Sequence, residues 1–273
     1  MILFCVNFFL GLSCCFLTIF PFNLDPLLSL ERKFAEPIFA IKSFFAKNEF
    51  PSQVKPKNNY TLVLVGDSMT AMLGEKEIEE ELKRFYKDKE IKVINYGVGS
   101  TSLDTAINRF AESVIKGDES LNPIFSHNPD VVLLESFGNN PFNLSKEIGL
   151  RKQTEKLDKI LKTIKEKDPK IVIIFVATIA PSKNYGQGVL ELSSKERKEA
   201  QELRTAYIKN HIDYAKTHKI PLIDIYRKSF SETDEVKEEY INRSDFIHPS
   251  ERGIDFINRE ITNFIFDRRI LPL

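Results

Sequence analysis

From residue 60 onward, the sequence alternates between short apolar runs and longer amphipathic stretches. The short runs are bounded by turn residues and the long stretches have helical periodicity, which indicates β-strands alternating with α-helices. Two of the runs, VVLL in residues 131–134 and IVIIFV in residues 171–176, are apolar at every position, as expected of strands buried on both faces. We therefore expect a three-layer α/β/α fold, in which helices cover both faces of a mostly parallel five-stranded sheet.

The predicted strands are Thr61–Val65, Ile91–Asn95, Asp130–Glu135, Lys170–Val176 and Ile220–Ile225. The predicted helices are Glu75–Tyr86, Ser102–Ile115, Ser145–Lys165, Ser194–Thr217 and a last one from about Pro249 to Phe266. A sheet of this kind binds ligands beyond the carboxyl ends of its strands, where the chain turns into the next helix. The loops at those ends are therefore the expected location of a functional site.

Four loops rich in glycine and small polar residues fall at such positions. They are Gly66–Thr70, Asn95–Thr101 and Ser136–Pro141 after the first three strands, and Asp245–Ser250 before the last helix. Together they permit acyl transfer through a serine, in which a histidine base activates the hydroxyl and a carboxylate orients the histidine. We predict Ser68 as the nucleophile, His248 as the base and Asp245 as the orienting acid.

Acyl transfer also needs hydrogen-bond donors for the oxyanion that develops on the carbonyl oxygen. The backbone N–H of Ser68 is one candidate, and the side-chain amide of Asn140 is another. The glycine turn after the second strand supplies a third, because a glycine leaves its N–H unhindered. We prefer Gly97 over Gly99 for this role, because Gly97 follows Asn95 by two residues.

Each motif also has an ordinary structural explanation. Gly-Asp-Ser is commonly a turn, and Gly-Val-Gly-Ser is equally a phosphate loop or a tight strand exit. Glu135 is either a buried carboxylate with a raised pKa or a polar strand end, and His127, His211 and His218 lack an adjacent motif.

A dinucleotide-binding domain would need the full glycine fingerprint after the first strand. An α/β-hydrolase would need a second glycine where Thr70 stands.

In combination, the four blocks resemble the SGNH hydrolases, the GDSL-like esterase superfamily, over residues 60 to about 268. Gly66-Asp67-Ser68 matches the first block, Gly97 or Gly99 the glycine block, Gly138-Asn139-Asn140 the third and Asp245-Phe246-Ile247-His248 the fourth. Two departures stand out. Pro141 replaces the aspartate that commonly follows the block-three asparagine, and the glycine block is irregular.

The resemblance implies a flavodoxin-like SGNH hydrolase fold and a serine esterase that uses no cofactor or metal. It implies a Ser68–His248–Asp245 triad and an oxyanion hole formed by Ser68, Gly97 and Asn140. The expected substrate is an ester of a short acyl group such as acetyl, carried by envelope carbohydrate and hydrolysed or transferred. Two alternatives stay open: a catalytically silent domain that binds glycan or partners an acyltransferase, and a lipid-directed lipase or thioesterase.

The first 24 residues contain no charged side chain, and the first fifty hold eleven of the 22 phenylalanines. A helix of about 20 residues spans the roughly 30 Å hydrocarbon core, so we expect a transmembrane anchor at residues 1–24. A secretory signal is the alternative, although it lacks a basic n-region and a clear cleavage site. We expect residues 25–59 to form an amphipathic juxtamembrane segment and linker, and residues 60–273 to form the hydrolase-like domain.

The location of the domain follows from this leader segment. Arg32 and Lys33 come after the apolar stretch, and counted alone they favour a cytoplasmic domain. We nevertheless expect an extracytoplasmic domain that is membrane-anchored, or secreted if the leader is cleaved. An anchored enzyme that faces outward in turn suggests acetyl groups on envelope polysaccharide as its substrate.

Composition excludes several other functions. Lys and Arg together number 39, as do Asp and Glu, so the formal net charge of zero provides no field that attracts nucleic acid. All three cysteines, Cys5, Cys14 and Cys15, lie in the leader. The rest of the chain therefore has no disulfide framework, no thiolate metal site and no cysteine nucleophile.

Overall fold

The computed structural model describes residues 51–273. The predicted apolar segment 1–24 and most of the predicted linker lie outside these residues, so the anchor, the signal alternative and the domain boundaries stay predictions. Within residues 51–273, no helix combines the length and the apolar character that crossing a membrane requires.

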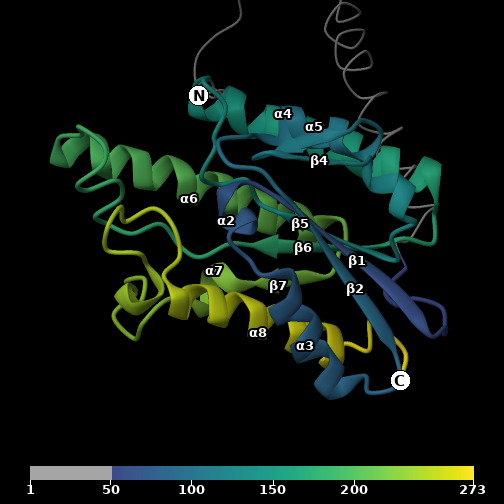
Figure 1. Ribbon diagram of the computed structural model, residues 1–273. Helices are drawn as coiled ribbons and strands as arrows, with labels where there is room; N and C mark the ends of the chain where they lie inside the picture. The colour runs from purple at the N-terminus through teal and green to yellow at the C-terminus, as the bar shows by residue number, and fades with distance from the viewer. Residues whose placement is uncertain (1–50) are drawn as a thin grey trace, which may run out of the picture. The chain divides into compact units, whose positions relative to one another are not determined.

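A five-stranded parallel sheet forms the middle layer (Figure 1). The strand order is β2-β1-β5-β6-β7, and every neighbouring pair is parallel. This is the flavodoxin-like order, and it confirms the predicted fold class. All five predicted strands are present, with each end within two residues of the predicted one: β1 (Asn59–Gly66), β2 (Glu90–Gly97), β5 (Val131–Glu135), β6 (Val172–Ala177) and β7 (Leu222–Asp224).

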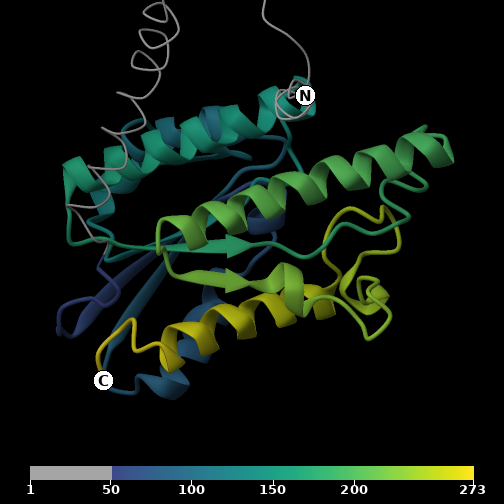
Figure 2. The same cartoon turned by 180° about the vertical axis from the view of Figure 1, so that it is seen from behind.

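Helices cover both faces of the sheet (Figures 1 and 2). One face carries α3 (Glu75–Phe85) and α8 (Glu251–Asp267), and the other carries α5 (Lys146–Lys167) and α6 (Ser194–Thr217). A capping box starts α6, because Ser193 and Glu196 exchange side-chain-to-backbone hydrogen bonds. The shorter helices are α2 (Ser68–Ala71), α4 (Leu103–Ala106), α7 (Ile225–Lys228) and the 3₁₀ turns η1 (Ile107–Phe110), η2 (Ile124–His127) and η3 (Glu238–Tyr240).

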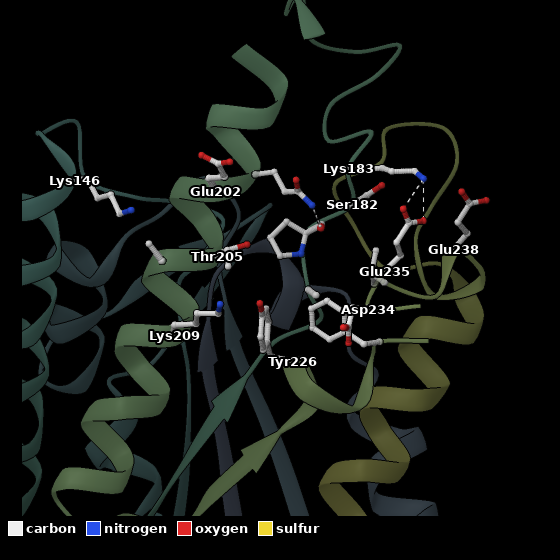
Figure 3. A pocket seen from close by; sticks show the side chains of 16 residues that line it. Lys146, Ser182, Lys183, Glu202, Thr205, Lys209, Tyr226, Asp234, Glu235 and Glu238 are labelled. Atoms are coloured by element: carbon white, nitrogen blue, oxygen red, sulfur yellow. Dashed lines mark hydrogen bonds and ion pairs between the residues drawn. The ribbon is translucent and has the colours of Figure 1, made fainter. Parts of the chain in front are cut away.

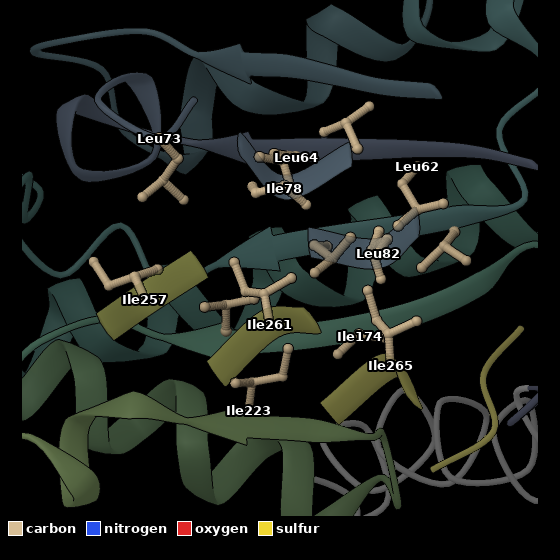
Figure 4. Close-up of a cluster of buried hydrophobic side chains, with 14 of the residues drawn as sticks. Leu62, Leu64, Leu73, Ile78, Leu82, Ile174, Ile223, Ile257, Ile261 and Ile265 are labelled. Atoms are coloured by element: carbon tan, nitrogen blue, oxygen red, sulfur yellow. The ribbon is translucent and has the colours of Figure 1, made fainter. Parts of the chain in front are cut away.

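The main hydrophobic core lies between the sheet and the α3–α8 pair (Figure 4). Leu62 and Leu64 point from β1 into this core, and the intervening Val63 and Val65 are equally buried. Full burial on both faces explains why the strand is apolar from Leu62 to Val65, and each such side chain contributes about 1.5–3 kcal/mol. The helices contribute Ile78, Leu82, Ile257, Ile261 and Ile265.

The predicted helix Ser102–Ile115 is wrong in its second half. The helical turns α4 and η1 end at Phe110, and the chain continues into a hairpin of β3 (Val114–Lys116) and β4 (Glu119–Leu121). Gly117 begins the two-residue turn at φ +62°, a left-handed conformation that a helix cannot contain. A Gly-Asp pair between short runs is a hairpin signal, and it overrides the helical periodicity here.

Side chains cover the outer edge of β2. The N–H groups of Val93 and Asn95 donate to the carboxylates of Glu79 (2.8 Å) and Glu75 (2.6 Å), both on α3. Lys116 Nζ, on the β3–β4 hairpin, donates to the Asn95 carbonyl oxygen at 2.8 Å. These three charged side chains take the hydrogen-bonding positions that another strand would otherwise use.

His211 on α6 is fully buried and stacks on Phe175 of β6, with ring centroids 4.1 Å apart and 12° between the ring planes. Burial lowers the pKa of His211 to about 3, and the Leu134 backbone, which approaches the ring without hydrogen-bonding geometry, opposes this shift. His211 is therefore a neutral core residue, consistent with its lack of a motif.

The buried ring predicts an acid-dependent loss of stability. Between pH 6.5 and about 3 the unfolded chain protonates this histidine and the folded chain does not, so the free energy of unfolding falls as pH falls. At pH 5 the loss is about 2 kcal/mol. Urea unfolding of wild type and His211→Leu at pH 5 and pH 7.5 measures it. An identical pH dependence in both proteins would contradict the prediction.

Candidate active site

Ser68 lies at the junction where β1 turns into α2. Asp67 caps this short helix, and its Oδ1 accepts the Met69 N–H at 2.8 Å. The turn is tight, because a Cβ on Gly66 would lie 1.9 Å from Thr70 Oγ1. The Ser68 hydroxyl is thus held at the carboxyl end of the sheet, where the sequence analysis expected it.

The three residues of the predicted triad come together. Ser68 Oγ lies 3.0 Å from His248 Nε2, although 180 positions separate them along the chain. On the other side of the ring, His248 Nδ1 lies 2.8 Å from Asp245 Oδ2. The geometry therefore forms a continuous line of hydroxyl, imidazole and carboxylate.

A local turn sets the direction of the Asp245 carboxylate. Its Oδ1 accepts the N–H groups of Ile247 (2.8 Å) and His248 (3.0 Å), and Phe246 takes a left-handed φ of +54°. Burial alone would raise the pKa of Asp245, but the hydrogen bonds from the His248 ring and these N–H groups outweigh it and hold the pKa below its usual value. Asp245 is therefore ionised at neutral pH and accepts the hydrogen of His248 Nδ1.

The expected oxyanion donor Gly97 is not free. Its N–H donates to Asn95 Oδ1 at 2.7 Å, and a Cβ at this position would lie 2.2 Å from Ala71 N. Gly97 instead allows β2 to pack closely against α2, which corrects the preference for Gly97 over Gly99. Gly99 lies beside the nucleophile, since a Cβ there would be 3.8 Å from Ser68 Cβ. Its N–H has no acceptor within residues 51–273.

Asn140 lies next to the same junction. Its Nδ2 donates to Asp67 Oδ2 at 2.8 Å, and an amide nitrogen has a second hydrogen that can serve an oxyanion. The preceding Asn139 is 9% exposed, and its side chain has no hydrogen-bond partner in the described part of the chain. Sequence reasoning assigned it no role, although it stands in the same block.

Two further charged groups lie close to Asp67. Glu135 is 3% exposed, and burial raises its pKa well above the usual value, with the charge of Asp67 adding to the effect. This confirms the buried interpretation of Glu135.

Arg109, on η1, is 2% exposed and donates from Nη1 to the carbonyl oxygens of Gly66 and Tyr96, at 2.7 Å each. Sequence reasoning missed Arg109, because an arginine in an amphipathic stretch is ordinarily exposed.

A cavity of about 520 Å³ opens between α6 and the segment that follows α7 (Figure 3). Tyr226 and Phe230 line it together with charged side chains of both signs, among them Lys209 and Asp234. Ser68 and His248 do not line it, so this cavity is separate from the triad.

Within residues 51–273, no group of three or more His, Cys, Asp or Glu side chains could hold a metal ion.

Comparison with known proteins agrees with this geometry. The family model described as GDSL-like Lipase/Acylhydrolase matches residues 62–261, which include all three residues of the triad. No curated protein sequence matches the chain.

Solved structures of low sequence identity share the fold. The lipase/acylhydrolase from Enterococcus faecalis is 19% identical with a TM-score of 0.54, covering 77% of this chain and 96% of its own. A catalytic mutant of an acetylxylan esterase from Geobacillus stearothermophilus is 16% identical with a TM-score of 0.56, covering 78% and 96%. A GDSL-like lipase from Bacteroides thetaiotaomicron is 16% identical with a TM-score of 0.50, covering 84% and 96%.

The two glycines after β2 should respond differently to substitution. In Gly97→Ala the new Cβ meets the α2 backbone at 2.2 Å, so we expect a loss of about 1–3 kcal/mol in unfolding free energy. Gly99→Ala is the matched control, because nothing lies closer than 3.8 Å to its Cβ. Thermal unfolding followed by circular dichroism compares the two variants with wild type. Equal Tm values for both would contradict the packing role of Gly97.

Proposed function

The chain belongs to the GDSL-like lipase/acylhydrolase family and is an enzyme that acts on ester bonds, and we propose that Ser68, His248 and Asp245 carry out its reaction. One observation carries this proposal: the line of contacts at 3.0 and 2.8 Å from the Ser68 hydroxyl through the His248 ring to the Asp245 carboxylate. Acyl transfer by a Ser-His-Asp triad uses these three groups in this order.

In the proposed mechanism, His248 Nε2 takes the proton of Ser68 Oγ while Oγ attacks the ester carbonyl carbon. Asp245 keeps the proton on Nδ1 and stabilises the imidazolium that forms. The tetrahedral intermediate then expels the alcohol, which receives the proton from His248, and an acyl-serine remains. In the second half, His248 takes a proton from a water molecule or an acceptor hydroxyl as its oxygen attacks the acyl carbon. His248 then returns the proton to Ser68 Oγ as the bond between Oγ and the acyl carbon breaks.

The oxyanion of the intermediate needs donors close to Ser68. We propose the backbone N–H groups of Ser68 and Gly99 and the side-chain amide of Asn140. Gly99 replaces Gly97 in this set because the Gly97 N–H already donates to Asn95. The contact of Asn140 with Asp67 fixes one amide hydrogen and leaves the other for the substrate.

For the substrate, we propose a short acyl group, such as acetyl, on a bulky alcohol such as a carbohydrate. The triad lies near the protein surface, with the His248 and Asp245 side chains 30% and 18% exposed. A site this open accepts an ester on a polymer, which an enclosed cavity would exclude. One similar fold is that of an acetylxylan esterase, which supports the carbohydrate part of the proposal.

We also propose that residues 1–24 tether the enzyme to a membrane, with the catalytic domain outside the cytoplasm. The support is the leader sequence, in which 24 residues pass without a charged side chain. Cell fractionation and protease treatment of intact cells test the two parts. Recovery of the full chain in the soluble fraction would contradict the tether. A domain that the protease cannot reach on intact cells would contradict its location outside the cytoplasm.

A fluorophosphonate probe should label the full chain covalently, because the probe reacts only with an activated serine hydroxyl. Ser68→Ala should abolish labelling while circular dichroism shows an unchanged fold. Ser126→Ala, which removes an exposed hydroxyl on η2, is the control and should label like wild type. A wild-type chain that stays unlabelled, yet binds glycan, would instead favour a catalytically silent binding domain.

Nitrophenyl esters of increasing chain length should be hydrolysed with decreasing kcat/KM, the acetyl ester being the best substrate. Each additional methylene that gains burial in a deep apolar pocket would contribute about 0.8 kcal/mol, or roughly fourfold in kcat/KM. A steady rise of kcat/KM from acetyl to octanoyl would therefore overturn the short-acyl proposal and favour a lipid-directed enzyme.

A further inference from the structure

The proposed mechanism leaves three buried ionisable side chains beside the nucleophile without a role. Asp67, Arg109 and Glu135 are 0%, 2% and 3% exposed and come from three different elements. Isolated charges in such an environment cost several kcal/mol, so the arrangement of their partners is informative.

Asp67 connects two parts of the proposed catalytic machinery. Its Oδ1 accepts the Met69 N–H of the helix that begins with Ser68, and its Oδ2 accepts the amide of Asn140, each at 2.8 Å. A movement of this carboxylate would therefore move both the nucleophile and an oxyanion donor. Displacements of about 1 Å are known to cost about 10²-fold in rate.

Glu135 fixes Asp67 from the opposite side. Its Oε2 accepts the Asp67 N–H at 3.2 Å, and its Oε1 accepts the Ser136 Oγ–H (2.7 Å) and the Phe137 N–H (2.9 Å). Burial raises the pKa of Asp67, and the hydrogen bonds with Met69, Asn140 and the Glu135 side chain oppose this rise. Since an ionised carboxylate only accepts, one of the two carboxyl groups must supply the hydrogen.

The charge balance indicates which group holds the proton. Arg109 is the cation that acts on both carboxyl groups, and a single positive charge offsets a single negative one. The charge of His248 opposes the rise that burial causes in the pKa of Asp67, and burial, with a smaller contribution from the charge of Asp67, raises the pKa of Tyr185. Asp67 accepts hydrogen bonds from Met69 and Asn140 as an anion would. Burial and the charge of Asp67 raise the pKa of Glu135 well above its usual value.

We propose that Glu135 is a positioning residue whose carboxyl group stays protonated, donates to the Asp67 carboxylate, and thereby holds Asn140 and Ser68 in place for catalysis. The inference rests on the proposed function of Ser68 and Asn140. It follows that loss of this proton at alkaline pH places two negative charges side by side. Their repulsion displaces Asp67, so kcat falls.

Glu135→Gln separates this role from a purely structural one. A glutamine amide donates to Asp67 at any pH, at the expense of the 3.2 Å contact with the Asp67 N–H. We expect kcat/KM within about threefold of wild type near neutrality and no alkaline fall in kcat. Glu135→Ala should lose about 10²-fold at all pH values. Glu79→Gln is the matched control, because Glu79 also accepts a strand N–H at 2.8 Å; it should keep the alkaline fall.

Infrared spectroscopy of the full chain provides a readout that does not depend on activity. Wild type and Ser68→Ala should both show the carbonyl band of a protonated carboxylic acid at neutral pH, and Glu135→Gln should lack it. The inference is overturned if Glu135→Gln keeps the carbonyl band, or if its kcat falls at alkaline pH as much as that of wild type. If wild type fails to react with the fluorophosphonate, the proposed function fails, and the infrared band still decides where the proton is. If Glu135→Ala does not fold, the glutamine variant and the band carry the test.

Discussion

The parallel register of β1 with its two neighbours is the constraint on which the site depends. Gly66 at the end of β1 pairs with Gly97 of β2, and Val65 pairs with Leu134 of β5. Three strands therefore end at one edge of the sheet, and the loops that follow them bring together Ser68, Gly99 and Asn140. The C-terminal turn then needs to supply only the imidazole and its carboxylate.

The same edge concentrates charge in a place that the fold would otherwise keep apolar. Two carboxyl groups and one guanidinium lie buried around the Asp67 backbone. Replacing buried ionic groups by apolar ones is often neutral or stabilising, so stability alone does not account for their presence. A fixed hydrogen-bonded network instead restricts the positions that neighbouring side chains can take, which suits a site whose reaction depends on small distances.

The strands and the triad could be predicted from the sequence because their signals are local. Apolar runs identify the buried strands, and parallel topology brings their exits together, so Ser68 and His248 could be paired across 180 positions. Other features depend on contacts that no local pattern shows. Gly97 has its N–H bound to Asn95, Arg109 is buried by elements distant in sequence, and the chain leaves the helical conformation after Phe110, although periodicity alone would continue it to Ile115.

The covered edge of β2 affects whether two molecules of this protein can associate by pairing their sheets. An exposed edge strand is a template on which a second chain can add by backbone pairing. Here Glu75, Glu79 and Lys116 occupy the outward N–H and carbonyl groups of Val93 and Asn95. An incoming strand would have to displace one charged side chain for each of these backbone bonds that it gains, so this side of the sheet resists aggregation. The protecting groups stand on α3 and on the β3–β4 hairpin, so the β2 edge is covered without any of the three residues of the triad.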